Sequence, residues 1–339
     1  MIGHWLARRI DASKEASGAE NTMDTEISEA KSQKDESSVS VQGRVVSELM
    51  SHLTNDLAIG KKIKSGELRK RMVEPAWKVP DCFTMTHIDM ENFSMKLLAS
   101  KENPNMEKII LQLHGGGYMG AVRNAYYVFA GLYNEVSHGM SVLTPDYRVA
   151  PEHLFPAALE DAVAAYQWLL DRGWFGNQII VAGDSAGGGL AMALVMYLRD
   201  HGMPLPGGVV AMSPWTDVTA SGESYETNYE KDPLFGNTKE SLIYLCEYPG
   251  EHDPMDPYIS PLFGDFRGFP PMLIQVGSTE MLLSDSVDVA AKARQQGIKV
   301  RLSIYEGMFH VFQMAYLNLP ESKRAWAEVG KFIDIISES

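Results

Sequence analysis

A serine flanked by glycines stands where an apolar run turns into a helix. Residues 183–187, Gly-Asp-Ser-Ala-Gly, have the G-x-S-x-G pattern, in which a strained strand-to-helix turn raises a serine hydroxyl above the end of a sheet. The apolar residues 179–182 are typical of a strand, and residues 190–194 continue as a helix. Glycines are needed because the two backbones approach closely at such a turn. The pattern indicates that Ser185 is a nucleophile, although a strand–turn–helix joint with an incidental serine would look the same.

A serine hydroxyl needs a base, and the base needs a third group that orients it. His310 fits the role of base because it stands in a loop between a strand-like run at 300–305 and the last expected helix. It also comes last in the chain order serine, acid, histidine that α/β-hydrolases use.

Two carboxylates compete for the role of the third group. Glu280 lies in an irregular loop, four residues beyond the strand-like run 272–276. Asp285 directly precedes an apolar-periodic helix expected at 286–296, so a helix N-cap explains it without catalysis. We therefore expect Glu280 to orient His310, with Asp285 as the alternative.

A glycine-rich loop is placed to bind negative charge. Residues 114–117, His-Gly-Gly-Gly, follow a strand-like run at 109–113 and match the HGGG-type oxyanion loop of lipases and esterases. Bare glycines let backbone N–H groups face a reacting oxygen without side-chain obstruction. The predicted donors are Gly116, Gly117 and, at the start of the helix after the serine, Ala186. A phosphate loop is the competing interpretation, but its G-x-x-x-x-G-K-[ST] pattern is absent.

The elements that must position these residues alternate along the chain. Strand-like runs are expected at 109–113, 141–144, 179–182, 209–212, 272–276 and 300–305, with helices at 125–137, 159–170, 190–198, 286–296 and 321–336. This alternation predicts an α/β fold with a doubly wound, mostly parallel sheet flanked by helices. Ahead of it, residues 83–90 and 93–99 predict a β-hairpin.

Three segments lie outside the alternation. Residues 1–40 are polar and predict an N-terminal extension, either a tail or a cap helix, and residues 41–75 predict cap helices at 42–59 and 65–73. Residues 215–270 contain no strand–helix unit, so they predict a cap insertion that shapes the substrate pocket between core segments 76–214 and 271–339. The aromatic candidates for this pocket are Tyr118, Trp215, Tyr229, Phe235, Tyr244 and Tyr248.

The composition restricts the partners. The chain has 339 residues and a formal net charge of −14, which argues against nucleic-acid binding and disfavours docking on anionic membranes. No apolar run approaches the roughly 18 residues of a membrane span, and residues 1–14 lack a secretory signal, so we expect a cytoplasmic protein. Cys82 and Cys246 form no metal-binding pattern, and we expect neither a metal nor a cofactor.

Four motifs follow one another in a specific order. They are His-Gly-Gly-Gly-Tyr at 114–118, Asp-Tyr-Arg-Val-Ala-Pro-Glu-His at 146–153, Gly-Asp-Ser-Ala-Gly-Gly at 183–188 and Ser-Pro-Trp-Thr-Asp at 213–217. Together they resemble the hormone-sensitive-lipase family (family IV) of bacterial esterases. The resemblance implies an α/β-hydrolase core with a helical cap, a carboxylesterase that prefers short-chain esters, and a possible homodimer.

The same resemblance implies a role for each site residue. Ser185 matches the nucleophile, His310 the base, and the glycine loop with Ala186 the oxyanion donors. Where many members carry D-P-L-x-D, residues 280–285 read Glu-Met-Leu-Leu-Ser-Asp, which resembles a subgroup with glutamate as the acid. We thus expect a serine carboxylesterase that acts through an acyl-enzyme.

Two other functions fit parts of the pattern. An amidase or peptidase would use the same triad, so only substrate tests separate it from an esterase. A non-catalytic ligand-binding receptor would use the same fold, as in the plant gibberellin receptor, which resembles these esterases but lacks the catalytic histidine. The presence of His310 argues against that second alternative.

Overall fold

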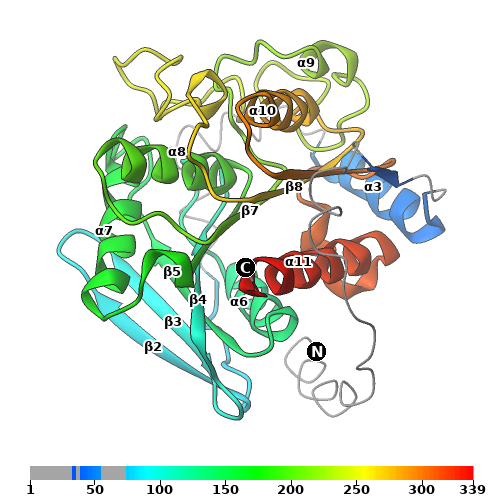
Figure 1. Cartoon of the computed structure of the whole chain (residues 1–339). Coiled ribbons are helices and arrows are strands. Elements are labelled where there is room, and N and C mark those ends of the chain that lie inside the picture. The colour runs from blue at the N-terminus through cyan, green and yellow to red at the C-terminus, as the bar shows by residue number, and fades with distance from the viewer. Residues whose placement is uncertain (1–32, 36–38, 55–73, 339) are drawn as a thin grey trace.

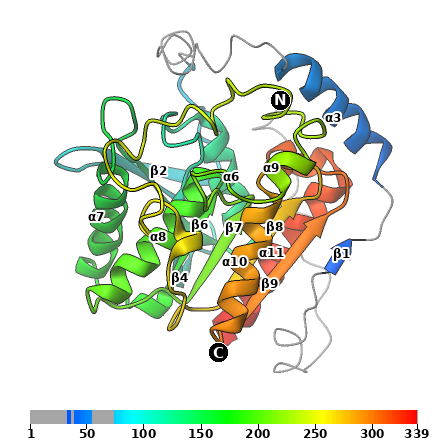
Figure 2. The same ribbon diagram turned by 90° about the horizontal axis from the view of Figure 1, so that it is seen from above.

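One twisted sheet runs through the middle of the molecule, and helices cover both of its faces (Figures 1 and 2). The computed structural model describes residues 33–35, 39–54 and 74–338. In these residues nine strands form the sheet in the order β1-β9-β8-β7-β6-β4-β5-β3-β2. The strands are β1 Gln33–Asp35, β2 Phe83–Asp89, β3 Ser94–Ser100, β4 Asn105–Leu113, β5 Met140–Asp146, β6 Ile179–Asp184, β7 Gly208–Met212, β8 Met272–Gly277 and β9 Val300–Tyr305.

Neighbouring strands are parallel except on either side of β3, which runs antiparallel to both β2 and β5. The central strands β6, β7 and β8 are buried along their whole length. Strands covered on both faces read as continuous apolar runs, which is why the sequence reveals them so clearly. The predicted α/β class with a mostly parallel, doubly wound sheet is confirmed.

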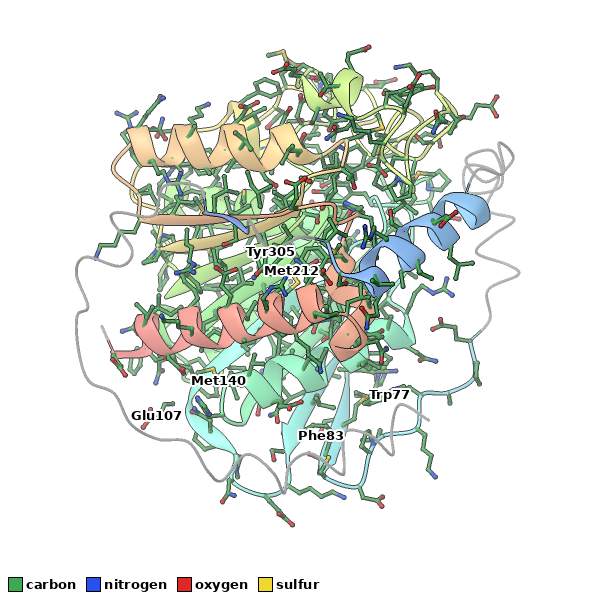
Figure 3. All side chains as sticks on the ribbon, turned by 90° about the vertical axis from the view of Figure 1, so that its right-hand side faces the viewer. Trp77, Phe83, Glu107, Met140, Met212 and Tyr305 are labelled. Carbon is green, nitrogen blue, oxygen red and sulfur yellow. The ribbon has the colours of Figure 1, made fainter. Side chains whose placement is uncertain are left out.

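The helices divide between the two faces of the sheet. Those of the described residues are α3 Val41–Thr54, α6 Asn124–Val136, α7 Ala157–Asp171, α8 Ala186–Asp200, α9 Ser224–Thr227, α10 Leu283–Gln295 and α11 Pro320–Glu338, with 3₁₀ turns at Gly176–Gln178, Pro261–Phe263 and Phe312–Asn318. Helices α7, α8 and α10 pack on one face, and α6 and α11 on the other. Figure 3 shows α10 and α11 on opposite sides of the sheet.

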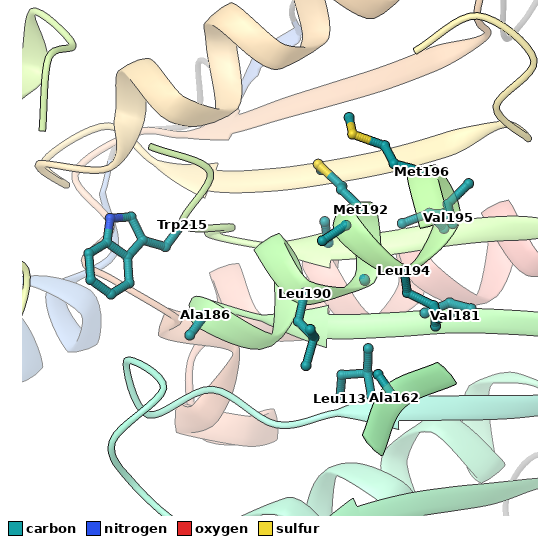
Figure 4. Close-up of a cluster of buried hydrophobic side chains, with 14 of the residues drawn as sticks. Leu113, Ala162, Val181, Ala186, Leu190, Met192, Leu194, Val195, Met196 and Trp215 are labelled. Atoms are coloured by element: carbon teal, nitrogen blue, oxygen red, sulfur yellow. The ribbon is translucent and has the colours of Figure 1, made fainter. Parts of the chain in front are cut away.

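Alternate residues of each strand supply the two cores. Leu111 and Val181 belong to the cluster beneath α7, α8 and α10, whereas Ile110 and Ile180 belong to the cluster beneath α6 and α11. In Figure 4, Leu190 and Leu194 of α8 lie beside the strands that carry Leu113 and Val181. Burying one such side chain contributes about 1.5–3 kcal/mol, so both cores stabilise β6 and the first core stabilises α8, the two elements that flank Ser185.

The residues that lead into helix α3 contact helix α11 and the loop before His310. Ser40 donates hydrogen bonds from its backbone N–H and its hydroxyl to the Glu321 carboxylate, at 2.8 and 2.9 Å, and its Oγ accepts the N–H of Gly43 at 2.9 Å. A Cβ on Gly307 would lie 2.3 Å from a Val39 methyl group, which shows how closely this entry segment packs on the loop before His310. The start of α3 is therefore capped by Ser40 and tied to α11.

The structure corrects some of the expected elements. Residues 33–35 form an edge strand beside β9, whereas a tail or helix was expected there; a three-residue polar strand has no periodicity that could reveal it. Helix α10 begins at Leu283, earlier than the expected residue 286, because Leu283 and Ser284 form its first turn. The 83–90/93–99 hairpin is confirmed as β2 and β3. Residues 55–59 of the expected first cap helix and the expected helix 65–73 lie outside the described residues.

The segment between β7 and β8, all of it among the described residues, contains no strand. Its described helices are only the short α9 and the turn at Pro261–Phe263, and otherwise it follows an irregular path. Figure 1 shows this segment together with α10 above one side of the sheet. Within the described ranges, no helix combines the length and apolar character needed to cross a membrane.

Candidate active site

Ser185 stands at the sharp turn between β6 and α8. Its backbone has φ 52° and ψ −123°, a strained conformation for a residue with a side chain. A Cβ on Gly183 would lie 2.2 Å from the carbonyl oxygen of Gly187, and a Cβ on Gly187 would lie 2.1 Å from that of Leu113. Both glycines are therefore required by backbone contact, which is the physical basis of the G-x-S-x-G pattern.

The structure brings together the three residues proposed for the triad. His310 Nε2 lies 2.9 Å from Ser185 Oγ, and His310 Nδ1 lies 2.8 Å from Glu280 Oε2. Glu280 is fully buried, whereas Ser185 and His310 retain 8% and 6% of their accessible surface. A carboxylate, an imidazole and a hydroxyl in one hydrogen-bonded line are the arrangement that makes a serine nucleophilic.

Both carboxylate oxygens of Glu280 have hydrogen-bond partners. Its Oε1 accepts hydrogen bonds from the Ser213 hydroxyl at 2.7 Å and from the Gly277 N–H at 2.6 Å. Its backbone is held as well, because the Asn228 side chain donates to the Glu280 carbonyl at 2.8 Å. The carboxylate is thus oriented with its other oxygen toward His310.

Asp285 makes different contacts and does not face His310. One of its oxygens accepts the N–H groups of Thr216 and Asp217, at 2.7 and 2.8 Å, and the other accepts the Tyr225 hydroxyl at 2.9 Å. The interpretation of Asp285 as a helix N-cap is wrong, because the N-cap of α10 is Leu282 and Asp285 lies inside the first turn. Burial, followed by the nearby Asp217 charge, raises the pKa of Asp285 to about 8.

The glycine loop is anchored to the residue before the nucleophile. The Gly115 N–H donates to Asp184 Oδ1 at 3.1 Å, and the Tyr126 hydroxyl donates to Asp184 Oδ2 at 3.2 Å. A Cβ on Gly115 would lie 2.3 Å from the Asp184 carboxylate, so this approach needs glycine. Burial raises the pKa of Asp184 to about 7, against the opposing influence of His310 and of these hydrogen bonds.

His114 takes part in the loop without reaching the serine. Its ring stacks on Tyr147 with centroids 4.0 Å apart, and its Nδ1 lies 2.8 Å from the Gly115 carbonyl oxygen. The Tyr147 hydroxyl donates to the His114 carbonyl at 2.5 Å. Burial lowers the pKa of His114, which favours a neutral ring that braces the loop.

Three backbone N–H groups are available near the serine. Gly116 and Gly117 have φ values of +114° and +62°, which turn the loop in a way that residues with side chains rarely adopt. Ala186 is the first residue of α8, so its N–H belongs to the unpaired first turn of the helix. Among the hydrogen bonds between described residues, none uses the N–H of Gly116, Gly117 or Ala186 as donor. Such free donors could bind an oxyanion.

Known proteins resemble both the sequence and this architecture. A family model for the alpha/beta hydrolase fold matches residues 110–314. An acetyl-hydrolase of Streptomyces hygroscopicus is 40% identical over 227 residues, which cover 67% of this chain and 75% of that protein.

Two solved structures share the fold over most of the chain. A crystal structure of EstE5 soaked with p-nitrophenyl butyrate has a TM-score of 0.79 at 35% identity, covering 88% of this chain and 99% of that one. A hormone-sensitive lipase from a metagenome library has a TM-score of 0.77 at 32% identity, covering 88% and 100%. The chain belongs to the hormone-sensitive-lipase family of α/β-hydrolases. Its enzyme class is that of a carboxylesterase.

The aromatic candidates for the substrate pocket of this esterase divide into three places. Phe235 packs against the His310 ring, with centroids 4.8 Å apart. Tyr118 is buried, stacks on Tyr248 at 3.9 Å, and lies 6.3 Å from Trp215. The backbone N–H of Trp215 donates to the Ser185 carbonyl at 2.8 Å, so this aromatic group is joined to the backbone of the nucleophile.

The remaining two candidates lie beside a lysine. Tyr229 and Tyr244 flank Lys239, whose Nζ lies 4.9 Å and 4.3 Å from their ring centroids. Both tyrosines are half-buried. Of the six aromatic candidates, Phe235 is the one whose ring packs against the imidazole of His310.

Sequence reasoning missed several residues of the site. Leu242 packs on the glycine loop, since a Cβ on Gly117 would lie 2.3 Å from its Cδ2. Ser213 contacts Glu280, and Asp184 holds the loop, although both stand within the quoted motifs. The motifs contained the signal for Ser213 and Asp184, but only the fold shows where their oxygens point. Within the described part of the chain, no group of three or more His, Cys, Asp or Glu side chains is placed to hold a metal.

Proposed function

We propose that this carboxylesterase hydrolyses short-chain carboxylic esters through an acyl-enzyme intermediate on Ser185. The observation that carries the proposal is the continuous line of hydrogen bonds from Ser185 Oγ through His310 to Glu280, at 2.9 and 2.8 Å. In this role Ser185 is the nucleophile, His310 the general base and acid, and Glu280 the group that orients the imidazole.

In the first half-reaction, Ser185 Oγ attacks the ester carbonyl carbon and its proton passes to His310 Nε2. The negative charge that develops on the carbonyl oxygen is bound by the N–H groups of Gly116, Gly117 and Ala186. Removing one such donor typically costs about 3 kcal/mol in the barrier. The C–O bond to the alcohol then breaks, and His310 returns the proton to the leaving alkoxide.

In the second half-reaction, water attacks the acyl-enzyme. His310 takes a proton from the water, the same N–H groups bind the second oxyanion, and Ser185 leaves with the proton that His310 returns. Glu280 stays ionised throughout and stabilises the imidazolium that forms twice in each cycle. The products are the carboxylic acid and the alcohol, and the enzyme is regenerated.

Two side chains favour small substituents on the ester. Leu242 packs against the glycine loop and Phe235 packs against His310. Bulky apolar side chains therefore lie beside both the proposed oxyanion donors and the proposed base. The names of similar proteins support the same substrate class, since one is called an acetyl-hydrolase and one crystal was soaked with p-nitrophenyl butyrate. We therefore propose acetyl to butyryl esters as the preferred range.

The test is hydrolysis of p-nitrophenyl esters from acetyl to palmitoyl by the wild type, Ser185→Ala and Leu242→Ala. We expect turnover of short esters by the wild type, its loss in Ser185→Ala, and a shift toward longer acyl chains in Leu242→Ala. Full activity of Ser185→Ala would refute the nucleophile. A wild type that is inert on every ester would favour the amidase or receptor alternatives, and p-nitroanilides would distinguish these two.

A further inference from the structure

Ser213 occupies a conformation that costs free energy. It follows the last residue of β7, is fully buried, and has φ +46°, in the left-handed region that favours glycine. Such a conformation costs about 1–3 kcal/mol for a residue with a side chain. Its N–H donates to the Gln275 carbonyl at 2.6 Å, so the neighbouring strand β8 holds it in place. A strained conformation of this kind persists where other contacts of the residue compensate its cost.

The hydroxyl of Ser213 contacts both Glu280 and the residue that follows His310. Ser213 Oγ donates to Glu280 Oε1 at 2.7 Å and accepts the N–H of Val311 at 3.1 Å. Val311 is bonded directly to His310 and itself has φ +48°. One hydroxyl therefore contacts both the carboxylate that orients the imidazole and the backbone that carries it.

A glutamate needs such a contact more than an aspartate would. Its side chain has one more rotatable bond, so its carboxylate can take more positions and more rotamer freedom must be removed. The Gly277 N–H, at 2.6 Å from Oε1, restrains the carboxylate from the side of β8. The Ser213 hydroxyl restrains it from the side of β7, which leaves Oε2 for His310 Nδ1.

We propose that Ser213 is a positioning residue that keeps the Glu280 carboxylate and the His310 ring in line with Ser185. This inference rests on the proposed triad. Removing the hydroxyl leaves the buried Val311 N–H without its acceptor and Glu280 Oε1 with a single donor, so both partners of the His310–Glu280 hydrogen bond become free to shift. Small misplacements at a reacting centre cost about 100-fold in rate.

The chain offers a matched control. Ser303 is also a buried serine, and its hydroxyl donates to Glu328 Oε1 at 2.6 Å. Ser303→Ala therefore deletes the same kind of serine–carboxylate hydrogen bond on β9, away from the triad. A loss caused by removing any buried hydroxyl would appear in both variants, whereas a positioning role would appear only in Ser213→Ala.

The experiment measures kcat and KM for p-nitrophenyl acetate in the wild type, Ser213→Ala, Ser303→Ala, Glu280→Gln and the Ser213→Ala/Glu280→Gln double variant. We expect Ser213→Ala to lower kcat by about 10- to 100-fold with KM within about threefold, and Ser303→Ala to keep kcat within about twofold. In the Glu280→Gln background, Ser213→Ala should have little further effect, because the group through which it acts is already disabled.

The outcomes separate this inference from the proposed function. If Ser185→Ala keeps the wild-type activity, both are wrong. If Ser185→Ala is inactive but Ser213→Ala keeps its kcat, or if the two losses multiply in the double variant, only the positioning role is wrong. Should Ser213→Ala fail to fold, Ser213→Gly also lacks the hydroxyl while relieving the positive φ, and the same outcomes apply to it.

Discussion

Replacing Glu280 by glutamine should stop catalysis while leaving the fold intact. Because Oε1 receives the Ser213 hydroxyl and the Gly277 N–H, the amide oxygen of the glutamine must occupy that position. The amide NH₂ then takes the place of Oε2, 2.8 Å from His310 Nδ1. Two N–H groups cannot face each other, so His310 must carry its proton on Nε2 and present an N–H to Ser185. That tautomer cannot accept the serine proton.

The magnitude follows from the same geometry. Escape by flipping the amide would put its NH₂ against the Gly277 N–H, which can only donate, and would break a buried hydrogen bond that costs about 1–3 kcal/mol when left unsatisfied. A serine hydrolase with the wrong histidine tautomer loses about 10⁴-fold in kcat. This loss equals about 5.5 kcal/mol in the barrier, at 1.36 kcal/mol per factor of ten.

Steady-state hydrolysis of p-nitrophenyl acetate, with unfolding in urea as a control, tests this reasoning. Asp285→Asn is the matched variant, because Asp285 is equally buried and its contacts are backbone N–H groups and Tyr225. We expect Asp285→Asn to keep kcat within about threefold, since an amide oxygen still accepts the two N–H groups. A Glu280→Gln variant with more than about one tenth of the wild-type kcat would refute the tautomer argument.

Three further results are expected. Asp184→Ala should lower kcat at least about tenfold, because it removes the acceptor of the Gly115 N–H. Asp184→Asn should keep kcat within about fivefold of the wild type, because its amide oxygen still accepts that N–H. Steady-state kinetics of both variants test this. Gly187→Ala places a Cβ 2.1 Å from the Leu113 carbonyl oxygen and should lower the free energy of unfolding by more than about 3 kcal/mol. Gly202→Ala, where φ is +66° and the space around the Cβ is open, should lower it by only about 1 kcal/mol. Urea unfolding of both variants measures the difference. The free energy of unfolding should fall as the pH rises from about 4 to about 8, because burial raises the pKa of Asp184 to about 7 and of Asp285 to about 8, so the folded state holds protons that the unfolded chain has already released. Each group contributes at most about 1.4 kcal/mol per pH unit. Asp285→Asn should remove most of the decrease above pH 7, where Asp184 has already lost about half of its protons; equal slopes in the two proteins would contradict this.

The parts of the site that the sequence predicted are those that leave a local pattern of residue types. The turn at Ser185 needs Gly183 and Gly187, because any Cβ there would meet backbone, and this requirement is visible as a motif. The central strands are buried on both faces, so their positions stand out as apolar runs. His310 followed from its place after the last strand, since the carboxyl ends of parallel strands share one edge of the sheet.

Choices between residues with the same chemistry needed the structure. Glu280 and Asp285 are both acids just beyond β8, and local spacing led to a wrong N-cap interpretation of Asp285. Its actual partners, Thr216 and Asp217, lie in the loop after β7, so the sequence around Asp285 contains no signal for them. The short strand β1 escaped prediction for a similar reason, because its pairing partner is the distant β9.

The sequence alone determined the α/β class, the nucleophile turn, the glycine loop and the order of the three proposed triad residues, since each depends on sterics or periodicity within a few neighbouring positions. Only the tertiary structure decided which oxygen of which acid faces His310, that Ser213 braces it, and that Leu242 and Phe235 stand against the reacting groups. Those contacts join residues far apart in the chain. Their directions arise from strand register and helix packing, which no local pattern of residue types encodes.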